Sequence, residues 1–273
     1  MPVYRRIRTR KQNSLTLELA KKMAEHSFPF QVTDSRWATK ECFTEAKYQN
    51  ITKELVDLDK SIGYKLMGGV LSSLHWSRRY EYPYTVINSK LPNNPPKDFR
   101  IIDCGAGAGP LQLYFGKRGI KYYAFDQDLF SLRRVARFKT ENNLNTLYPT
   151  YGNILDIPFP DNQFDRVFCI STLEHILEPL KDGTEVVLKG FLYGLLRILK
   201  PNGILVLTFD VNMSPKKSPH RLYPGEHQKM CKILGILPEQ PPQNRLYSSD
   251  TKAGQIMGTD LSVFCTTIKK CGN

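Results

Sequence analysis

The sequence predicts an α/β protein in which a mostly parallel β-sheet carries helices on both faces. Three observations lead to this prediction: strand-like apolar runs alternate with helix-like segments from about residue 99 onward, a glycine-rich loop follows the first run, and a carboxylate ends the second. Such alternation gives parallel strands joined by right-handed crossover helices. The expected strands are 100–104, 121–126, 147–151, 166–171, 204–210 and 261–268. The expected helices are 110–118, 129–142, 185–199 and 225–234.

The glycine-rich loop, Asp103–Pro110, follows the apolar pair Ile101 and Ile102. Its glycines, at positions 105, 107 and 109, alternate with alanines. Without Cβ atoms the backbone can turn sharply and come close to a ligand. Pro110 suits the first position of a helix, where its missing N–H costs nothing. The loop therefore predicts a nucleotide site at the start of a helix.

Two carboxylates indicate which kind of nucleotide this site takes. Asp126 ends the next expected strand, 17 residues beyond Gly109, and a carboxylate there can accept hydrogen bonds from both ribose hydroxyls. The loop reads G-x-G-x-G rather than the G-x-G-x-x-G of dinucleotide sites, and Asp103 lies two residues before its first glycine. A carboxylate at that point disfavours a diphosphate and favours a cationic ligand.

With these residues the chain resembles the class I S-adenosylmethionine-dependent methyltransferases, from about Phe99 to Lys270. The stretch Gly152–Asp165 is similar to the family's G-D-A-x-x-L-P-F-x-D-x-x-F-D, with Asn153 where the family usually has an adenine-contacting Asp. Segments 170–175 and 199–207 resemble the end of its fourth strand and its L-K-P-G-G turn with the fifth strand.

The resemblance implies a Rossmann-like methyltransferase fold with a seven-stranded sheet and a final reversed strand. It also implies S-adenosyl-L-methionine as cofactor and S-adenosyl-L-homocysteine as product. The implied cofactor-binding residues are Asp103, Gly105, Ala106, Gly107, Gly109, Asp126, Gln127, Asn153, Ile154 and Ser171.

The end of the fourth strand is where we expect proton chemistry. Ser171–Glu174 lacks the N/D-P-P-Y/F tetrapeptide that the resemblance leads us to expect of enzymes methylating an amino group of a base. Glu174 and His175 are the candidate catalytic residues, His175 taking the proton of an attacking hydroxyl. The alternative is that both side chains face solvent or bond to backbone. No metal site is predicted, because Ser171 replaces the first acid of the E-x-x-E-H pattern used by one family of RNA-end methyltransferases.

Residues 1–97 are expected to form a helical N-terminal extension, and 98–273 the cofactor-binding domain. Helices are expected from Asn13 or Ser14 to His26 and over 40–60, followed by an apolar stretch over 62–76. Ligands of open α/β sheets bind beyond the carboxyl ends of the strands, so the extension is a candidate lid. Within it, the aromatic segment 74–84 would wall a methyl-transfer site or pack against the sheet.

Composition indicates a soluble cytoplasmic enzyme. The chain has 273 residues of which 41% are hydrophobic, enough for a full core. It has no apolar run of 18 residues and no secretory leader pattern. Its six cysteines include no C-x-x-C pair, so we expect buried reduced thiols.

The formal net charge of +13 does not decide which kind of molecule would accept the methyl group. Basic residues gather between residues 1 and 22 and again over 216–221, and such clusters neutralise phosphates or remain solvated. The first hypothesis is methyl transfer to an oxygen or nitrogen of a small metabolite, such as a sugar, a phenol or a lipid-linked intermediate. The alternatives are an RNA methyltransferase that uses the basic arm and a cofactor-binding scaffold without turnover. The oligomeric state is left open.

Overall fold

The computed structural model describes residues 18, 21, 22, 24–61, 77–177, 184–213, 222–238 and 261–272. The strands are β1 Phe30–Trp37, β2 Arg100–Cys104, β3 Lys121–Asp126, β4 Leu147–Tyr151, β5 Phe164–Ile170, β6 Leu199–Asn212 and β7 Leu261–Lys270. A 3₁₀ helix spans Lys40–Thr44, and the α-helices are α2 Ala46–Ser61, α3 Arg78–Asn88, α4 Pro110–Gly116, α5 Leu129–Glu141, α6 Leu173–Leu177, α7 Thr184–Ile198 and α8 Pro224–Leu234.

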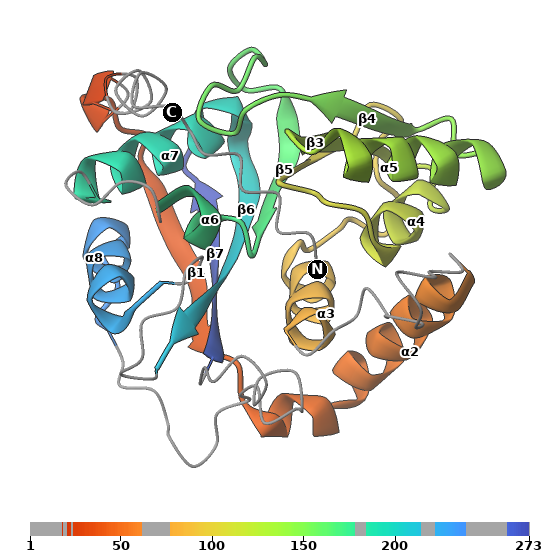
Figure 1. Cartoon of the computed structure of the whole chain (residues 1–273), viewed down its shortest axis with the longest axis horizontal. Helices are drawn as coiled ribbons and strands as arrows, with labels where there is room; N and C mark the ends of the chain where they lie inside the picture. The colour runs from red at the N-terminus through yellow and green to blue at the C-terminus, as the bar shows by residue number, and fades with distance from the viewer. Residues whose placement is uncertain are drawn as a thin grey trace.

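The seven strands form one sheet in the order β1-β7-β6-β5-β2-β3-β4 (Figure 1). Strands β6, β5, β2, β3 and β4 run parallel, and β7 runs antiparallel to both β6 and β1. The predicted fold class is therefore confirmed, including the reversed strand at the C-terminal end. Three of the expected strands, at 100–104, 121–126 and 147–151, match β2, β3 and β4 residue for residue.

The structure corrects the prediction that residues 1–97 are helical. Residues 30–37 form β1, which pairs with β7 from Phe30 opposite Lys270 to Trp37 opposite Phe264. The N-terminal region thus completes the sheet at one edge. Its expected helical character is confirmed in α2, which covers most of the expected 40–60 helix.

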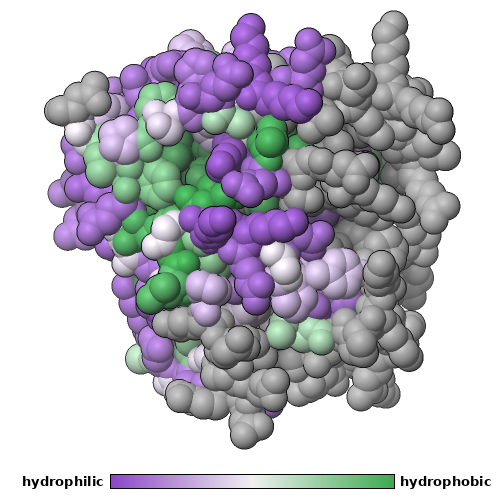
Figure 2. Space-filling view, turned by 90° about the vertical axis from the view of Figure 1, so that its left-hand side faces the viewer, coloured by the Kyte–Doolittle hydropathy of each residue, from purple (hydrophilic) through white to green (hydrophobic). Residues whose placement is uncertain are grey.

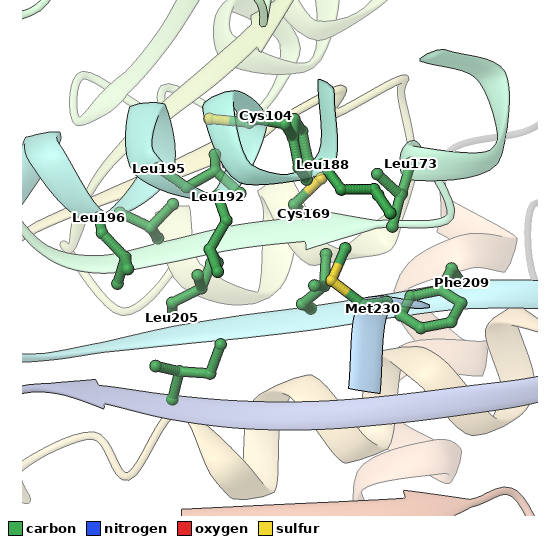
Figure 3. Close-up of a cluster of buried hydrophobic side chains, with 14 of the residues drawn as sticks. Cys104, Cys169, Leu173, Leu188, Leu192, Leu195, Leu196, Leu205, Phe209 and Met230 are labelled. Atoms are coloured by element: carbon green, nitrogen blue, oxygen red, sulfur yellow. The ribbon is translucent and has the colours of Figure 1, made fainter. Parts of the chain in front are cut away.

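Helices cover both faces of the sheet, as expected for this class (Figure 1). One buried cluster joins α6, α7 and α8 to the sheet, with Leu188, Leu192 and Leu195 of α7 directed toward the strands (Figure 3). The other cluster packs α2, α3, α4 and α5 against the opposite face. The helices on the two faces together hold the carboxyl ends of the parallel strands in a fixed position.

The six cysteines are all free, and five of them are buried, while Cys271 is half-buried. Cys104 and Cys169 lie in the apolar cluster beneath α7 (Figure 3). Burial raises the pKa of both thiols well above the ordinary value. They are therefore neutral and act as small apolar side chains, as predicted.

Several predicted features lie outside the described residues. They are the basic residues up to position 17, most of the 14–26 helix, the 62–76 stretch and the second basic cluster at 216–221. In the described part of the chain no helix is long and apolar enough to cross a bilayer. The face seen from the left of Figure 1, where α8 and β1 lie, shows apolar areas interrupted by hydrophilic side chains (Figure 2).

Candidate functional site

The carboxyl ends of β2, β3 and β5 meet at one edge of the sheet, where open α/β sheets bind ligands. A pocket opens there between the glycine-rich loop, the end of β3 and the start of α6. It is lined by Gly105, Phe125, Asp126, Gln127, Gly152, Ile154, Thr172, His175 and Ile176. Five of these were predicted as site residues, namely Gly105, Asp126, Gln127, Ile154 and His175. They come from segments far apart in the sequence that the sheet brings together.

The glycine-rich loop has the conformation that its sequence requires. Gly105 and Gly107 have φ angles of +81° and +53°, in the left-handed region that side chains with a Cβ rarely adopt. A Cβ at Gly105 would lie 2.2 Å from Thr172 Oγ1, whereas one at Gly107 would meet no atom within 4 Å. The loop is thus tightly packed at Gly105, and at Gly107 it leaves open space in which a ligand can approach the backbone.

The buried side chain of Gln112 holds the loop at Ala106 and Gly109. Its Oε1 accepts from the N–H of Gly109 at 2.7 Å, and its Nε2 donates to the carbonyl of Ala106 at 3.1 Å. Pro110 occupies the start of α4, as predicted. The loop is therefore held by the first turn of the helix that follows it.

Asp126 lies at the end of β3, where the sequence predicts a carboxylate that binds a ribose. Its Oδ2 accepts from the N–H of Gly107 at 2.8 Å, and its Oδ1 accepts from the N–H of Asp128 at 2.8 Å. Burial raises its pKa above the ordinary value, and these backbone hydrogen bonds oppose the rise. Each carboxylate oxygen retains a lone pair for a ligand hydroxyl.

Asp103, the last residue but one of β2, is 2% exposed. Its Oδ2 accepts from the Tyr122 hydroxyl at 2.7 Å, and its Oδ1 has no hydrogen-bond partner among the described residues. Burial raises the pKa of Asp103 to about 7; the Tyr122 hydrogen bond and the charge of Arg78 oppose this, while the charge of Asp126 adds to it. A buried carboxyl oxygen without a donor suits a ligand that brings one, and a cationic donor best.

The segment after β4 contributes Ile154 to the pocket wall. Asn153 forms a turn in which its Oδ1 accepts from the N–H of Leu155 at 3.1 Å. One of its acceptor positions is therefore already used within the loop. Gln127 follows Asp126 and lines the same pocket.

The structure separates the two candidate catalytic residues. His175 is exposed and lines the pocket. Glu174 is fully buried, its Oε1 accepts from the N–H of Asp210 at 3.4 Å, and burial together with the charge of Asp210 raises its pKa well above the ordinary value. His175 can therefore meet a substrate at the pocket, whereas Glu174 is held beneath it in the neutral form.

Ser171 was predicted to contact the cofactor, and the structure gives its side chain two protein partners. It lies just after β5 with a φ of +43° and is 6% exposed. Its hydroxyl donates to Glu81 Oε1 at 2.6 Å and accepts from Arg78. Arg78 and Glu81, both from α3, were not predicted as site residues. The available signal was an acid within the aromatic run Tyr80–Tyr84.

Comparison with known proteins identifies a domain in this region. Residues 102–207 match the family model described as a methyltransferase domain. An uncharacterized protein of Methanocaldococcus jannaschii is 38% identical over 80 residues, which cover 29% of this chain and 31% of that protein. The ubiquinone biosynthesis O-methyltransferase of Rickettsia bellii is 24% identical over 171 residues, covering 63% of this chain and 64% of that enzyme. The chain thus spans less than two thirds of the length of either relative.

Solved structures share the fold over most of the chain. The [4+2]-cyclase SpnF has a TM-score of 0.52 at 17% identity, with 84% of this chain and 98% of that chain covered. Geranyl diphosphate C-methyltransferase from Streptomyces coelicolor A3(2) has a TM-score of 0.50 at 13% identity, with the same coverage. Since one of these neighbours is named a cyclase and the other a methyltransferase, the shared fold leaves the reaction to be argued from the site.

Proposed function

We propose that this chain, which carries a class I S-adenosylmethionine-dependent methyltransferase domain, transfers a methyl group from S-adenosylmethionine to an oxygen or nitrogen of a small metabolite. The observation that carries the proposal is the arrangement around the glycine-rich loop. Asp103 offers a buried carboxyl oxygen that lacks a donor among the described residues, Asp126 offers lone pairs beside the loop, and the backbone at Gly107 has open space next to it. This set suits a ligand with a cationic group and a ribose.

The residues present fit the cofactor at three points. Asp126 would accept hydrogen bonds from the ribose hydroxyls, and Asp103 would accept one from the cationic amino group. Arg78 of α3, whose charge acts on Asp103 and whose side chain is 19% exposed, would be available to the cofactor's carboxylate. When bound, S-adenosylmethionine supplies a methyl group on a positively charged sulfur.

On the acceptor side, His175 is the group that would hold and move a proton. Its imidazole lines the pocket and lies in the first turn after β5. An imidazole can accept the proton of a hydroxyl as that oxygen attacks, which raises the nucleophilicity of the oxygen. An oxygen acceptor is further supported by the similarity to a ubiquinone biosynthesis O-methyltransferase. For a neutral amine acceptor, alignment in a pocket that excludes water is sufficient.

The first test is binding of S-adenosylhomocysteine to the full-length chain by calorimetry. We expect one site per chain, and the absence of binding would reject the proposal. The second test follows radioactive methyl transfer from S-adenosylmethionine to separate panels of phenols, sugars, lipid-linked intermediates and RNA. Labelling of a small molecule supports the proposal. Labelling of RNA alone, with an affinity that falls as salt rises, would replace it with the RNA methyltransferase alternative. Binding without any labelling would favour the scaffold alternative.

A further inference from the structure

A buried carboxylate on α3 contacts the strand ends beside the pocket. Glu81 is fully buried, and its Oε1 accepts from two hydroxyls, Ser171 Oγ at 2.6 Å and Thr208 Oγ1 at 2.6 Å. Its Oε2 forms an ion pair with Arg78. One carboxylate thus joins α3 to the carboxyl end of β5 and to β6, through residues 90 and 127 positions later in the chain.

The backbone at one of these contacts is strained. Ser171 has a φ of +43°, a left-handed conformation that a serine adopts only when its surroundings hold it there. Its N–H donates to the carbonyl of Thr208 at 3.0 Å, and its hydroxyl is held between Glu81 and Arg78. The turn at Ser171 is therefore fixed by side chains from a different part of the sequence.

This turn sets the position of the pocket wall. The next residue, Thr172, packs against the glycine-rich loop and donates from Oγ1 to the carbonyl of Gly105 at 3.4 Å. Thr172 and His175 both line the pocket. Because the Thr172 side chain touches Gly105 so closely, a shift of the Ser171 turn would change the width of the pocket between the loop and α6.

A fully buried carboxylate that pairs with a guanidinium only 19% exposed carries a desolvation cost that apolar residues would avoid. Burial alone would raise the pKa of Glu81, yet the charge of Arg78 and the hydrogen bonds from Ser171 and Thr208 hold it below the ordinary value. The carboxylate is therefore ionised and accepts strong hydrogen bonds. Such a group is well suited to fixing a single geometry, since displacement of either partner leaves a buried charge unsatisfied.

We propose that Glu81 is a positioning residue that holds the Ser171 turn, and with it Thr172 and His175, in the geometry that binds the cofactor. The alternative is that Glu81 only fastens α3 to the sheet. This inference rests on the proposed function for the identity of the ligand, while the contacts that carry it are independent of the reaction.

The matched control is Tyr84→Phe. Tyr84 also fastens α3, because its hydroxyl donates to Asp34 Oδ2 of β1 at 2.7 Å and bonds Thr267 Oγ1 of β7 at 3.0 Å, on strands other than the one that leads into the Ser171 turn. Comparison of Tyr84→Phe with Glu81→Ala and Glu81→Gln separates the two explanations. The glutamine keeps an oxygen for Ser171 and Thr208 and removes the charge that pairs with Arg78.

The experiment measures the melting temperature, the affinity for S-adenosylhomocysteine and the hydrogen exchange of the amides of 171–176 in the full chain. For Glu81→Ala we expect affinity to fall by about tenfold or more and exchange in 171–176 to accelerate. For Glu81→Gln we expect affinity within about fivefold of the unaltered chain, since the hydroxyl contacts remain. For Tyr84→Phe we expect a lower melting temperature with unchanged affinity and unchanged exchange in 171–176.

Affinity losses that follow the melting temperature in all three variants would overturn the positioning role, as would unchanged exchange at 171–176 in Glu81→Ala. If Glu81→Ala does not fold, Ser171→Ala is measured in its place, and unaltered affinity and exchange in that variant would likewise overturn the role. If the unaltered chain does not bind S-adenosylhomocysteine, the proposed function fails, and the exchange comparison alone decides the role of Glu81.

Discussion

Replacing Asp103 with asparagine tests whether the buried carboxyl beside the glycine-rich loop is protonated in the folded chain. In the folded chain the pKa of Asp103 is about 7, against an ordinary value of 3.8, mainly because the side chain is buried. Between these two values the unfolded chain is ionised at this residue and the folded chain is protonated. Stability contributed by the protonated carboxyl is therefore fully present below pH 3.8 and is lost as the pH rises to 7.

The size of the effect follows from this window. From pH 5.5 to pH 7 the unfolded chain is ionised and the folded chain is not, so stability falls by about 1.36 kcal/mol per pH unit, or about 2 kcal/mol in all. Asp103→Asn removes this titration. The amide oxygen can still accept from the Tyr122 hydroxyl, so the geometry of the contact is kept. Any effect of the asparagine side chain on the free energy of unfolding that does not depend on pH cancels when two pH values are compared.

The assay is urea unfolding of both proteins at pH 5.5 and pH 8. The free energy of unfolding of Asp103→Asn, relative to the unaltered chain, should rise by about 2 kcal/mol from the lower to the higher pH. Calorimetry at pH 8 should show about 10- to 100-fold weaker binding of S-adenosylhomocysteine, because a charge-assisted hydrogen bond is lost. A stability difference that stays constant between the two pH values would show that Asp103 does not titrate there and would refute the reasoning.

Other substitutions test the remaining site residues. Asp126→Ala should weaken S-adenosylhomocysteine binding by at least about tenfold in calorimetry, since it removes hydrogen bonds to the ribose and the one from the N–H of Gly107; unchanged affinity would reject the assignment. Gly107→Val should abolish binding in the same assay, because a φ of +53° disfavours a β-branched residue and the valine side chain would fill the open space that the ligand needs; retained binding would contradict this. For a hydroxyl acceptor, His175→Ala should lower turnover by roughly 10²- to 10⁴-fold with cofactor affinity within a few-fold, whereas an equal loss of both would indicate a structural role. Deletion of residues 1–12 should leave the melting temperature nearly unchanged, because this basic segment has few large apolar residues; a large drop would show that it packs on the domain.

Local sequence predicted the glycine-rich loop and the strands that lead to the pocket well. The strands that carry Asp103 and Asp126 at or near their carboxyl ends are short and mostly apolar, and parallel strands bring their carboxyl ends to one edge of the sheet. The spacing of the glycines predicted a sharp turn, and the structure has left-handed φ angles at Gly105 and Gly107. In each case the residue type and its immediate neighbours contain the necessary information.

Features that depend on distant partners could not be predicted in this way. Strand β1 mixes polar and apolar residues without clean alternation, and it is stabilised by pairing with β7, more than 200 residues later. Glu81 in an aromatic helix gives no local sign that its partners are Ser171 and Thr208. Glu174 and His175 are adjacent in sequence, yet one is buried and the other is exposed.

The sequence by itself therefore determined the sheet class, the glycine-rich loop and the two carboxylates beside it, because these follow from local periodicity, backbone freedom and strand direction. The tertiary structure alone decided which strand fills the edge beside β7, which of Glu174 and His175 reaches the pocket, and which residue holds the turn at Ser171. The physical reason is that burial, pKa and hydrogen-bond partners are properties of a packed environment, and the packing here joins segments separated by 90 residues or more.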